Sequence, residues 1–148
     1  IALSAGLFEQ ASSSKLAKAM DNAYTLTKSD RYYNYSDYIL PSRSVAAHHI
    51  VPGAAPEAAE ARAIISGMGI PINSAENGVY LSMKADFNLS GAVHAGGHST
   101  AYYTTVNERI VNAFTNAPLD YDAQKSAVIS ELDKIATELM TGKLALGN

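Results

Sequence analysis

The sequence predicts an α-rich α+β domain, on the evidence of its length, its apolar spacing and two short segments of strand character. The chain has 148 residues, of which 47% are hydrophobic and 17% are charged, and this composition is typical of one globular domain. Apolar side chains recur at helical spacing in four stretches, whereas residues 78–81 and the segment that ends at His48-His49 resemble strands. We therefore expect a single domain over residues 1–148, in which helices outweigh strands.

The first two predicted helices have clear boundary signals. The first helix is expected to begin at Ser14, a residue type that caps helix N-termini, and to continue to about Thr27, with apolar side chains at helical spacing. A second helix is expected to begin at Pro56, which suits a first helical turn, and to end at Gly67 and Gly69.

Two longer helices are predicted in the second half of the chain. The third covers about residues 99–114, and its apolar stripe consists of Tyr103, Val106, Ile110 and Phe114. The fourth covers about residues 121–140, with Asp120 and Asp122 at its positive end and Gly142 as its stop.

Composition and charge exclude several classes of protein. A net charge of −3 does not provide the basic surface of proteins that bind nucleic acid by bulk electrostatics, so any such binding must be local. The chain has no cysteine, so a metal ion must be held by histidine, carboxylate or amide oxygen. No apolar run is long enough to cross a membrane, and the first eight residues are too short for a signal peptide and lack its basic flank. Because the sequence starts without methionine, we expect it to be the C-terminal part of a larger protein.

The four histidines fall into two pairs, His48-His49 and His94 with His98. Adjacent residues at a strand end point to opposite sides, so one imidazole can face a metal ion while the other faces a substrate. A spacing of four places two imidazoles on one helical face, or in one glycine-rich turn, which is a familiar way to bind a divalent ion. The competing interpretation is that each histidine is a satisfied polar group or a surface residue.

Short motifs follow one another along residues 47–107, namely Ala47-His48-His49-Ile50-Val51-Pro52, Ala61-Arg62, Gly69-Ile70, Ile72-Asn73-Ser74-Ala75-Glu76-Asn77-Gly78-Val79-Tyr80-Leu81, His94-Ala95-Gly96-Gly97-His98, Tyr102-Tyr103 and Val106-Asn107. Their order resembles that of the AHH nucleases, a family of the HNH and endonuclease VII, or ββα-metal, superfamily. The resemblance covers about residues 44–110 and is most specific at residues 47–49 and 73–81. It implies an HNH-like ββα-metal core, which we place over residues 44–116. The resemblance says little about the flanks, where the residue pattern itself predicts an N-terminal helical and tyrosine-rich extension over residues 1–43 and a C-terminal helix over residues 117–148.

The resemblance also implies roles for single residues. In relatives with an adjacent histidine pair the first binds the metal and the second is the general base, which assigns these roles to His48 and His49. The asparagine of the HNH pattern falls on Asn77, which is expected to fix the loop by backbone hydrogen bonds and to orient the base. His98 and His94 match the metal ligands on the helix side, and the reach of His94 from its glycine-rich turn stays open.

The implied cofactor is one divalent metal ion. Nitrogen ligands suit zinc, nickel or manganese, whereas magnesium prefers oxygen, so the identity among these four stays open. Arg62 is a candidate contact for a substrate phosphate, and its alternative is pairing with Glu57 or Glu60 on the helix surface.

The activity implied by the resemblance is metal-dependent hydrolysis of nucleic acid, with DNA favoured as the substrate. AHH domains commonly form toxins of polymorphic toxin systems, so a secreted or delivered toxin that acts in the target-cell cytoplasm, with a cognate immunity protein as partner, is expected. Two alternatives remain: an RNase that uses the same histidines, and a non-enzymatic interaction domain in which the histidines close a structural metal site. An open coordination position distinguishes the enzyme from the structural site.

Overall fold

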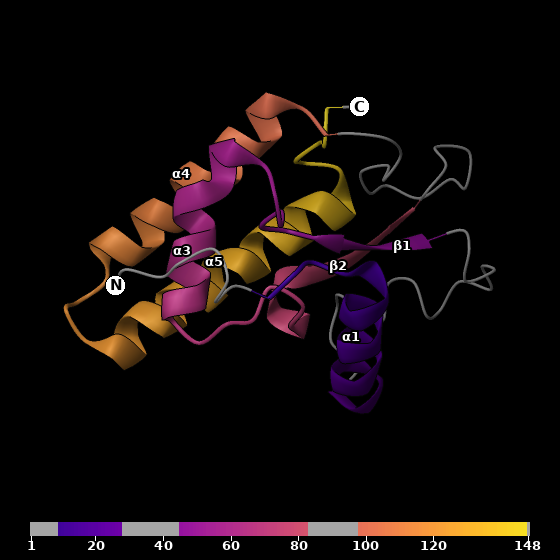
Figure 1. Ribbon diagram of the computed structural model, residues 1–148, viewed down its shortest axis with the longest axis horizontal. Coiled ribbons are helices and arrows are strands. Elements are labelled where there is room, and N and C mark those ends of the chain that lie inside the picture. The colour runs from indigo at the N-terminus through magenta and orange to yellow at the C-terminus, as the bar shows by residue number, and fades with distance from the viewer. Residues whose placement is uncertain (1–8, 28–44, 83–97, 148) are drawn as a thin grey trace.

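The computed structural model of the chain describes residues 9–27, 45–82 and 98–147 (Figure 1). His94 and the tyrosine-rich stretch at residues 32–38 lie outside these residues. In chain order the elements are α1 (Ser13–Thr27), β1 (Val45–His49), the 3₁₀ turn η3 (Pro56–Ala58), α3 (Ala59–Gly67), the 3₁₀ turn η4 (Ala75–Asn77), β2 (Gly78–Ser82), α4 (Thr100–Asn116) and α5 (Tyr121–Thr141).

The α-rich α+β class predicted from the sequence is confirmed, and so are the four helices and two strands, within a few residues at their ends. Strands β1 and β2 form an antiparallel pair in which His48 lies opposite Val79 and His49 opposite Gly78. This pair followed by α4 is consistent with the ββα-metal arrangement of HNH-like proteins. None of the helices among the described residues is both long and apolar enough to cross a membrane.

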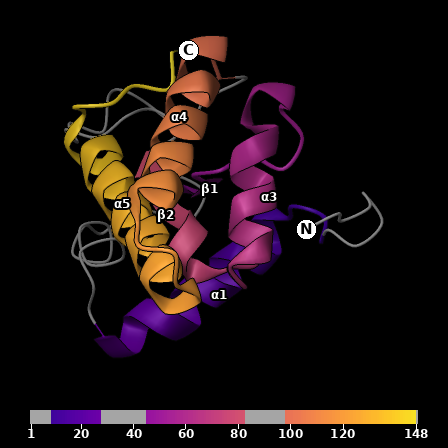
Figure 2. The same ribbon diagram turned by 90° about the vertical axis from the view of Figure 1, so that its left-hand side faces the viewer.

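The small sheet lies between α1 on one side and α3, α4 and α5 on the other (Figures 1 and 2). One face carries Val79 and Leu81, which join the main core with residues of α3, α4 and α5. The other face packs on α1, where Leu16 and Met20 form a second buried cluster with Ala47. Helix α1 comes so close at Gly78 that an added Cβ would lie 2.6 Å from Sδ of Met20 and 2.8 Å from Cδ1 of Leu16. A side chain at residue 78 would therefore require the side chains of Leu16 and Met20 to shift.

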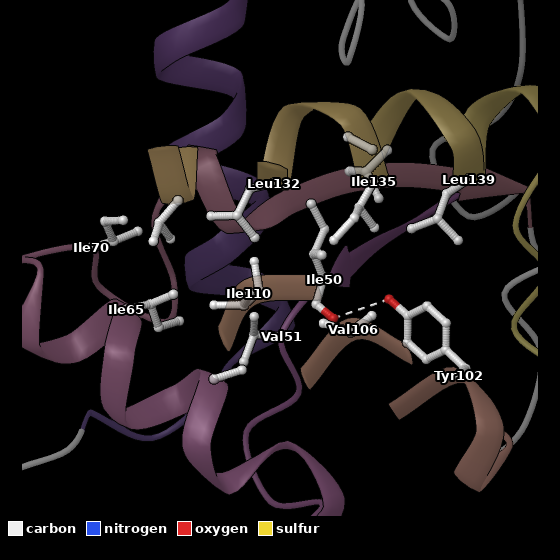
Figure 3. Close-up of a cluster of buried hydrophobic side chains, with 14 of the residues drawn as sticks. Ile50, Val51, Ile65, Ile70, Tyr102, Val106, Ile110, Leu132, Ile135 and Leu139 are labelled. Carbon is white, nitrogen blue, oxygen red and sulfur yellow. Dashed lines mark hydrogen bonds between the residues drawn. The ribbon is translucent and has the colours of Figure 1, made fainter. Parts of the chain in front are cut away.

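The main core fixes α4 against the segment that follows β1 (Figure 3). Ile50 and Val51 are fully buried against Val106 and Ile110 of α4, together with residues of α5. The buried tyrosine of α4 is Tyr102, which is 2% exposed, whereas the predicted stripe residue Tyr103 is only partly buried. The core thus presents the start of α4 to the end of β1.

Helix boundaries follow the local chemistry that the sequence contains. Ser99 caps α4 by accepting a hydrogen bond from the backbone N–H of Tyr102, and Asp120 caps α5 in the same way. Gly142 ends α5 in the left-handed conformation, with φ of 80°. The predicted N-cap of α1 shifts from Ser14 to Ser12, whose Oγ accepts from the backbone N–H of Lys15.

Candidate functional site

The adjacent histidines at the end of β1 point to opposite faces of the sheet. The side chain of His48 reaches α4, where Nε2 lies 2.8 Å from the hydroxyl of Tyr102. The side chain of His49 lies on the face that packs on α1, and Nε2 is 2.8 Å from Oδ1 of Asn73. The alternation of side chains along a strand produces this separation.

A chain of hydrogen bonds fixes the ring of His48. The hydroxyl of Tyr102 donates to the carbonyl oxygen of Ile50 at 3.0 Å (Figure 3), and because it carries only one hydrogen, it accepts from Nε2 of His48. The proton of the His48 ring therefore lies on Nε2, and Nδ1 carries the lone pair. His48 and Tyr102 are each 2% exposed, so water does not compete for these bonds. Burial also raises the pKa of Tyr102 far above its ordinary value, which keeps the hydroxyl protonated.

His98, directly before the N-cap of α4, lies beside His48. The two ring centroids are 5.0 Å apart with an interplanar angle of 69°, and Nδ1 of His98 is buried. Two imidazoles that share one ion through bonds of about 2.0–2.1 Å keep their centroids about 4.5–5.2 Å apart. The separation and the nitrogen donors of this pair thus fit a divalent ion.

The fit concerns two ligands only. Within the described parts of the chain, no three histidine or carboxylate side chains gather closely enough to hold an ion. The third predicted ligand, His94, lies outside the described residues. The hydrogen bond from Nε2 of His48 to the hydroxyl of Tyr102 is of the kind that metal-binding histidines make with the ring nitrogen that does not bind the ion.

Asn73 holds His49 in one orientation. Its Nδ2 donates to the carbonyl oxygen of Gln10 at 2.8 Å, and its Oδ1 accepts from the backbone N–H of Ser12 at 2.8 Å. Because these backbone groups have fixed roles, the amide cannot be flipped, and Oδ1 accepts the bond from Nε2 of His49. Nδ1 of His49 therefore carries the lone pair and is the atom able to take a proton.

The surroundings of His49 keep its ring neutral near pH 7. Burial lowers the pKa of His49 from 6.5, and this effect outweighs the opposing effects of the Asn73 hydrogen bond and of the negative charge of Glu9. A neutral imidazole at neutral pH is able to act as a base.

Asn77 is fully buried, and the hydrogen bonds of its side-chain amide are to backbone groups. Its Oδ1 accepts from the N–H of Val51 at 2.8 Å, and its Nδ2 donates to the carbonyl oxygens of Val51 and Ile72. The predicted fixing of the loop is thus present in the structure. The amide that bonds the His49 ring, however, is Asn73 rather than Asn77.

Arg62 of α3 stabilises the loop after β1. Its Nη1 donates to the carbonyl oxygens of Pro52 at 3.0 Å and of Ala55 at 2.8 Å. The predicted alternatives were a substrate phosphate and a surface pair with Glu57 or Glu60. In the structure the backbone engages Nη1 of the guanidinium, and burial lowers the pKa of the group.

Reasoning from the sequence missed Asn73 and the role of Tyr102. Both lie inside quoted motifs, Ile72-Asn73-Ser74 and Tyr102-Tyr103. The sequence signal that pointed to Asn73 was its position four residues before Asn77. Two asparagines so close together can serve different functions, one bonding the backbone and the other a histidine ring.

A comparison with protein families finds one match, over residues 29–139, to a nuclease family of the HNH/ENDO VII superfamily with conserved AHH. The match contains Ala47-His48-His49, both strands and α4 in full, whereas α1 and residues 9–12 precede it. No significant match was found among the curated proteins or the solved structures.

Proposed function

Because the chain belongs to the AHH family of nucleases in the HNH/ENDO VII superfamily, we propose that it hydrolyses DNA with one divalent metal ion and His49 as the general base. Family membership itself makes the chain a nuclease with nucleic acid as substrate. What the proposal adds is the choice of DNA, the requirement for the ion and the roles of single residues.

The observation that supports these roles is the division of the histidine pair between two faces of the sheet. His48 lies with His98 on the α4 face, at a separation that suits shared ligation. His49 lies on the other face, with Nδ1 carrying its lone pair. Ligand and base are thus adjacent in sequence without competing for one position.

His48 and His98 would hold the ion, which supplies positive charge to stabilise the phosphorane and the leaving oxygen. Nδ1 of His49 takes a proton from a water molecule, and the water oxygen forms a bond to phosphorus. The bond from phosphorus to one sugar oxygen breaks, and that oxygen takes a proton from solvent. Tyr102 and Asn73 keep the two imidazoles in the tautomers that these roles require.

We further propose that the activity is that of a delivered antibacterial toxin acting in the cytoplasm of its target cell, with an immunity protein as partner. The resemblance to toxin-associated AHH domains supports this context, since a cell that makes such a nuclease needs protection from it. In this proposal Arg62 contributes to phosphate binding through the part of its guanidinium that the loop carbonyls do not engage.

The test is to incubate the purified protein with plasmid DNA and, separately, with total RNA, with and without divalent metal and chelator. We expect metal-dependent nicking of the plasmid that the chelator abolishes. Cleavage of RNA alone, unaffected by chelator, would instead identify a metal-free RNase. Metal binding without cleavage of either substrate would identify a structural metal site.

Two variants separate the roles of the histidine pair. His49→Ala is expected to lower the cleavage rate by about 10²–10⁴-fold and to leave metal affinity nearly unchanged. His48→Ala is expected to weaken metal binding measured by calorimetry, with partial recovery of cleavage at excess metal. A His49→Ala protein that retains most of its nicking rate would remove His49 from the mechanism.

A further inference from the structure

Residues 9–12, which precede α1, form a short strap across the face of the site that contains His49. The strap lies outside the family match at residues 29–139, so family membership assigns it no role. Three contacts attach it: the carbonyl of Gln10 and the N–H of Ser12 bond the amide of Asn73, and Ala11 packs on Gly53.

The two backbone bonds determine how Asn73 presents itself to His49. A side-chain amide that bonded only to a histidine ring would be free to rotate and to offer either its oxygen or its NH₂ group. With Nδ2 bonded to Gln10 and Oδ1 bonded to Ser12, only Oδ1 faces Nε2 of His49. The strap thus selects the tautomer of His49 through Asn73.

The contact with Gly53 shows how closely the strap approaches the loop after β1. A Cβ added at Gly53 would clash with Cβ of Ala11, but would lie 3.6 Å from its Cα and 3.7 Å from its N. The obstacle is therefore a single methyl group. The loop has little freedom to move away, because Arg62 bonds the carbonyls of Pro52 and Ala55 on both sides of Gly53.

We infer that Asn73, locked by the strap of residues 9–12, is the positioning residue that holds His49 with its proton on Nε2 and its lone pair on Nδ1. The inference rests on the proposed function in one respect only, namely that His49 is the general base. The segment before α1 thereby becomes part of the nuclease site, although it lies outside the family match.

The experiment exchanges one methyl group between the strap and the loop in the full chain. Gly53→Ala introduces the clash and is expected to displace the strap, whereas Gly53→Ala combined with Ala11→Gly removes the clash, since the nearest remaining Ala11 atoms lie at ordinary contact distance. Nitrogen-15 NMR of the metal-free protein reads the tautomer of His49, with its signals assigned by comparison with His49→Gln. We expect the wild type to show the Nε2–H form, Gly53→Ala to show a mixture of tautomers, and the double variant to return to the Nε2–H form.

Kinetics provide the second readout. Misplacement of a catalytic group by about 1 Å costs on the order of 10²-fold, so we expect kcat of Gly53→Ala to fall by about 10–100-fold with KM changed much less. The double variant is expected to recover most of kcat, because Ala11→Gly removes the clash. Asn73→Ala removes the amide itself, together with its two bonds to the strap, and is expected to give the same mixture of His49 tautomers.

An unchanged His49 tautomer in both Gly53→Ala and Asn73→Ala would overturn the inference, and so would a double variant that fails to recover. The NMR readout needs neither metal nor substrate. A wild-type protein that cleaves no nucleic acid would therefore refute the proposed function, while the spectra still decide the positioning role of Asn73.

Discussion

Removal of one oxygen atom, in Tyr102→Phe, tests the hydrogen-bond chain that supports His48. Phenylalanine keeps the ring in the core, where its centroid lies 5.6 Å from that of His48 and 5.9 Å from that of His98. The change removes the bond from Nε2 of His48 at 2.8 Å and the bond to the carbonyl of Ile50 at 3.0 Å. Because residue 102 is 2% exposed, water does not replace the hydroxyl.

The expected cost follows from these two buried partners. Each buried group left without its bond costs about 1–3 kcal/mol, so we expect the free energy of unfolding to fall by about 2–4 kcal/mol. Loss of an outer hydrogen bond to a metal-binding histidine lowers affinity by about 10–100-fold. Urea denaturation of the metal-free protein measures the first quantity, and calorimetric titration with metal measures the second.

Tyr103→Phe is the matched control, because Tyr103 is only partly buried and its hydroxyl forms no hydrogen bond with the residues that the structure describes. We expect its stability and metal affinity to stay close to those of the wild type. A Tyr102→Phe protein that matches this control in both measurements would refute the assigned tautomer of His48 and its support by Tyr102.

Three further predictions concern pH, the buried amide and salt. Burial lowers the pKa of His49 in the folded chain, so below about pH 6.5 the unfolded chain binds a proton at this residue more readily than the folded chain does. The free energy of unfolding should therefore fall as the pH is lowered from about 7.5 to about 5.5. Urea titrations of His49→Gln at the same pH values should show a flatter dependence. Asn77→Ala removes three hydrogen bonds to backbone groups of Val51 and Ile72, so thermal and urea unfolding should show a loss of about 2–4 kcal/mol, and a loss below about 1 kcal/mol would contradict the fixing role. With a net charge of −3, we expect few phosphate contacts and a weak dependence of DNA affinity on salt, since each phosphate neutralised adds about 0.9 to the logarithmic slope. A steep slope would reveal a basic groove, and the neutral variant Arg62→Gln should reduce the slope by about 0.9 if Arg62 contacts phosphate.

The fold was predictable because its elements carry local signals. The apolar spacing and the stop at Gly142 located α5, and the glycine conformation there is the expected one. The two strands were recognised by short apolar segments, and the antiparallel register between His48 and Val79 is a tertiary result that no local pattern contains.

The site was predictable as far as residue type and strand alternation reach. The opposite directions of His48 and His49 follow from the geometry of any strand. The choice between Tyr102 and Tyr103 did not follow, because residues three and four positions before Val106 both lie on its side of a helix. Only the packing of α4 against Ile50 selects Tyr102 for burial.

Asn73 escaped prediction for a different reason. Its role depends on Gln10 and Ser12, which lie 63 and 61 residues away in the sequence. An asparagine in a turn is ordinarily explained by local backbone bonds, so nothing near residue 73 indicates a long-range partner. The three-dimensional approach of the strap gives this residue its task.

His48 and His49 are adjacent at the end of β1, and this adjacency itself constrains the strand. Side chains alternate along a strand, so a single inserted residue between His48 and His49 would turn both imidazoles toward α4, away from Asn73. A substitution at either histidine is a smaller change, because the other keeps its own support in Tyr102 or Asn73. Spacing within this strand therefore matters as much as identity, because an insertion would separate His49 from Asn73 although both histidines remain in the sequence.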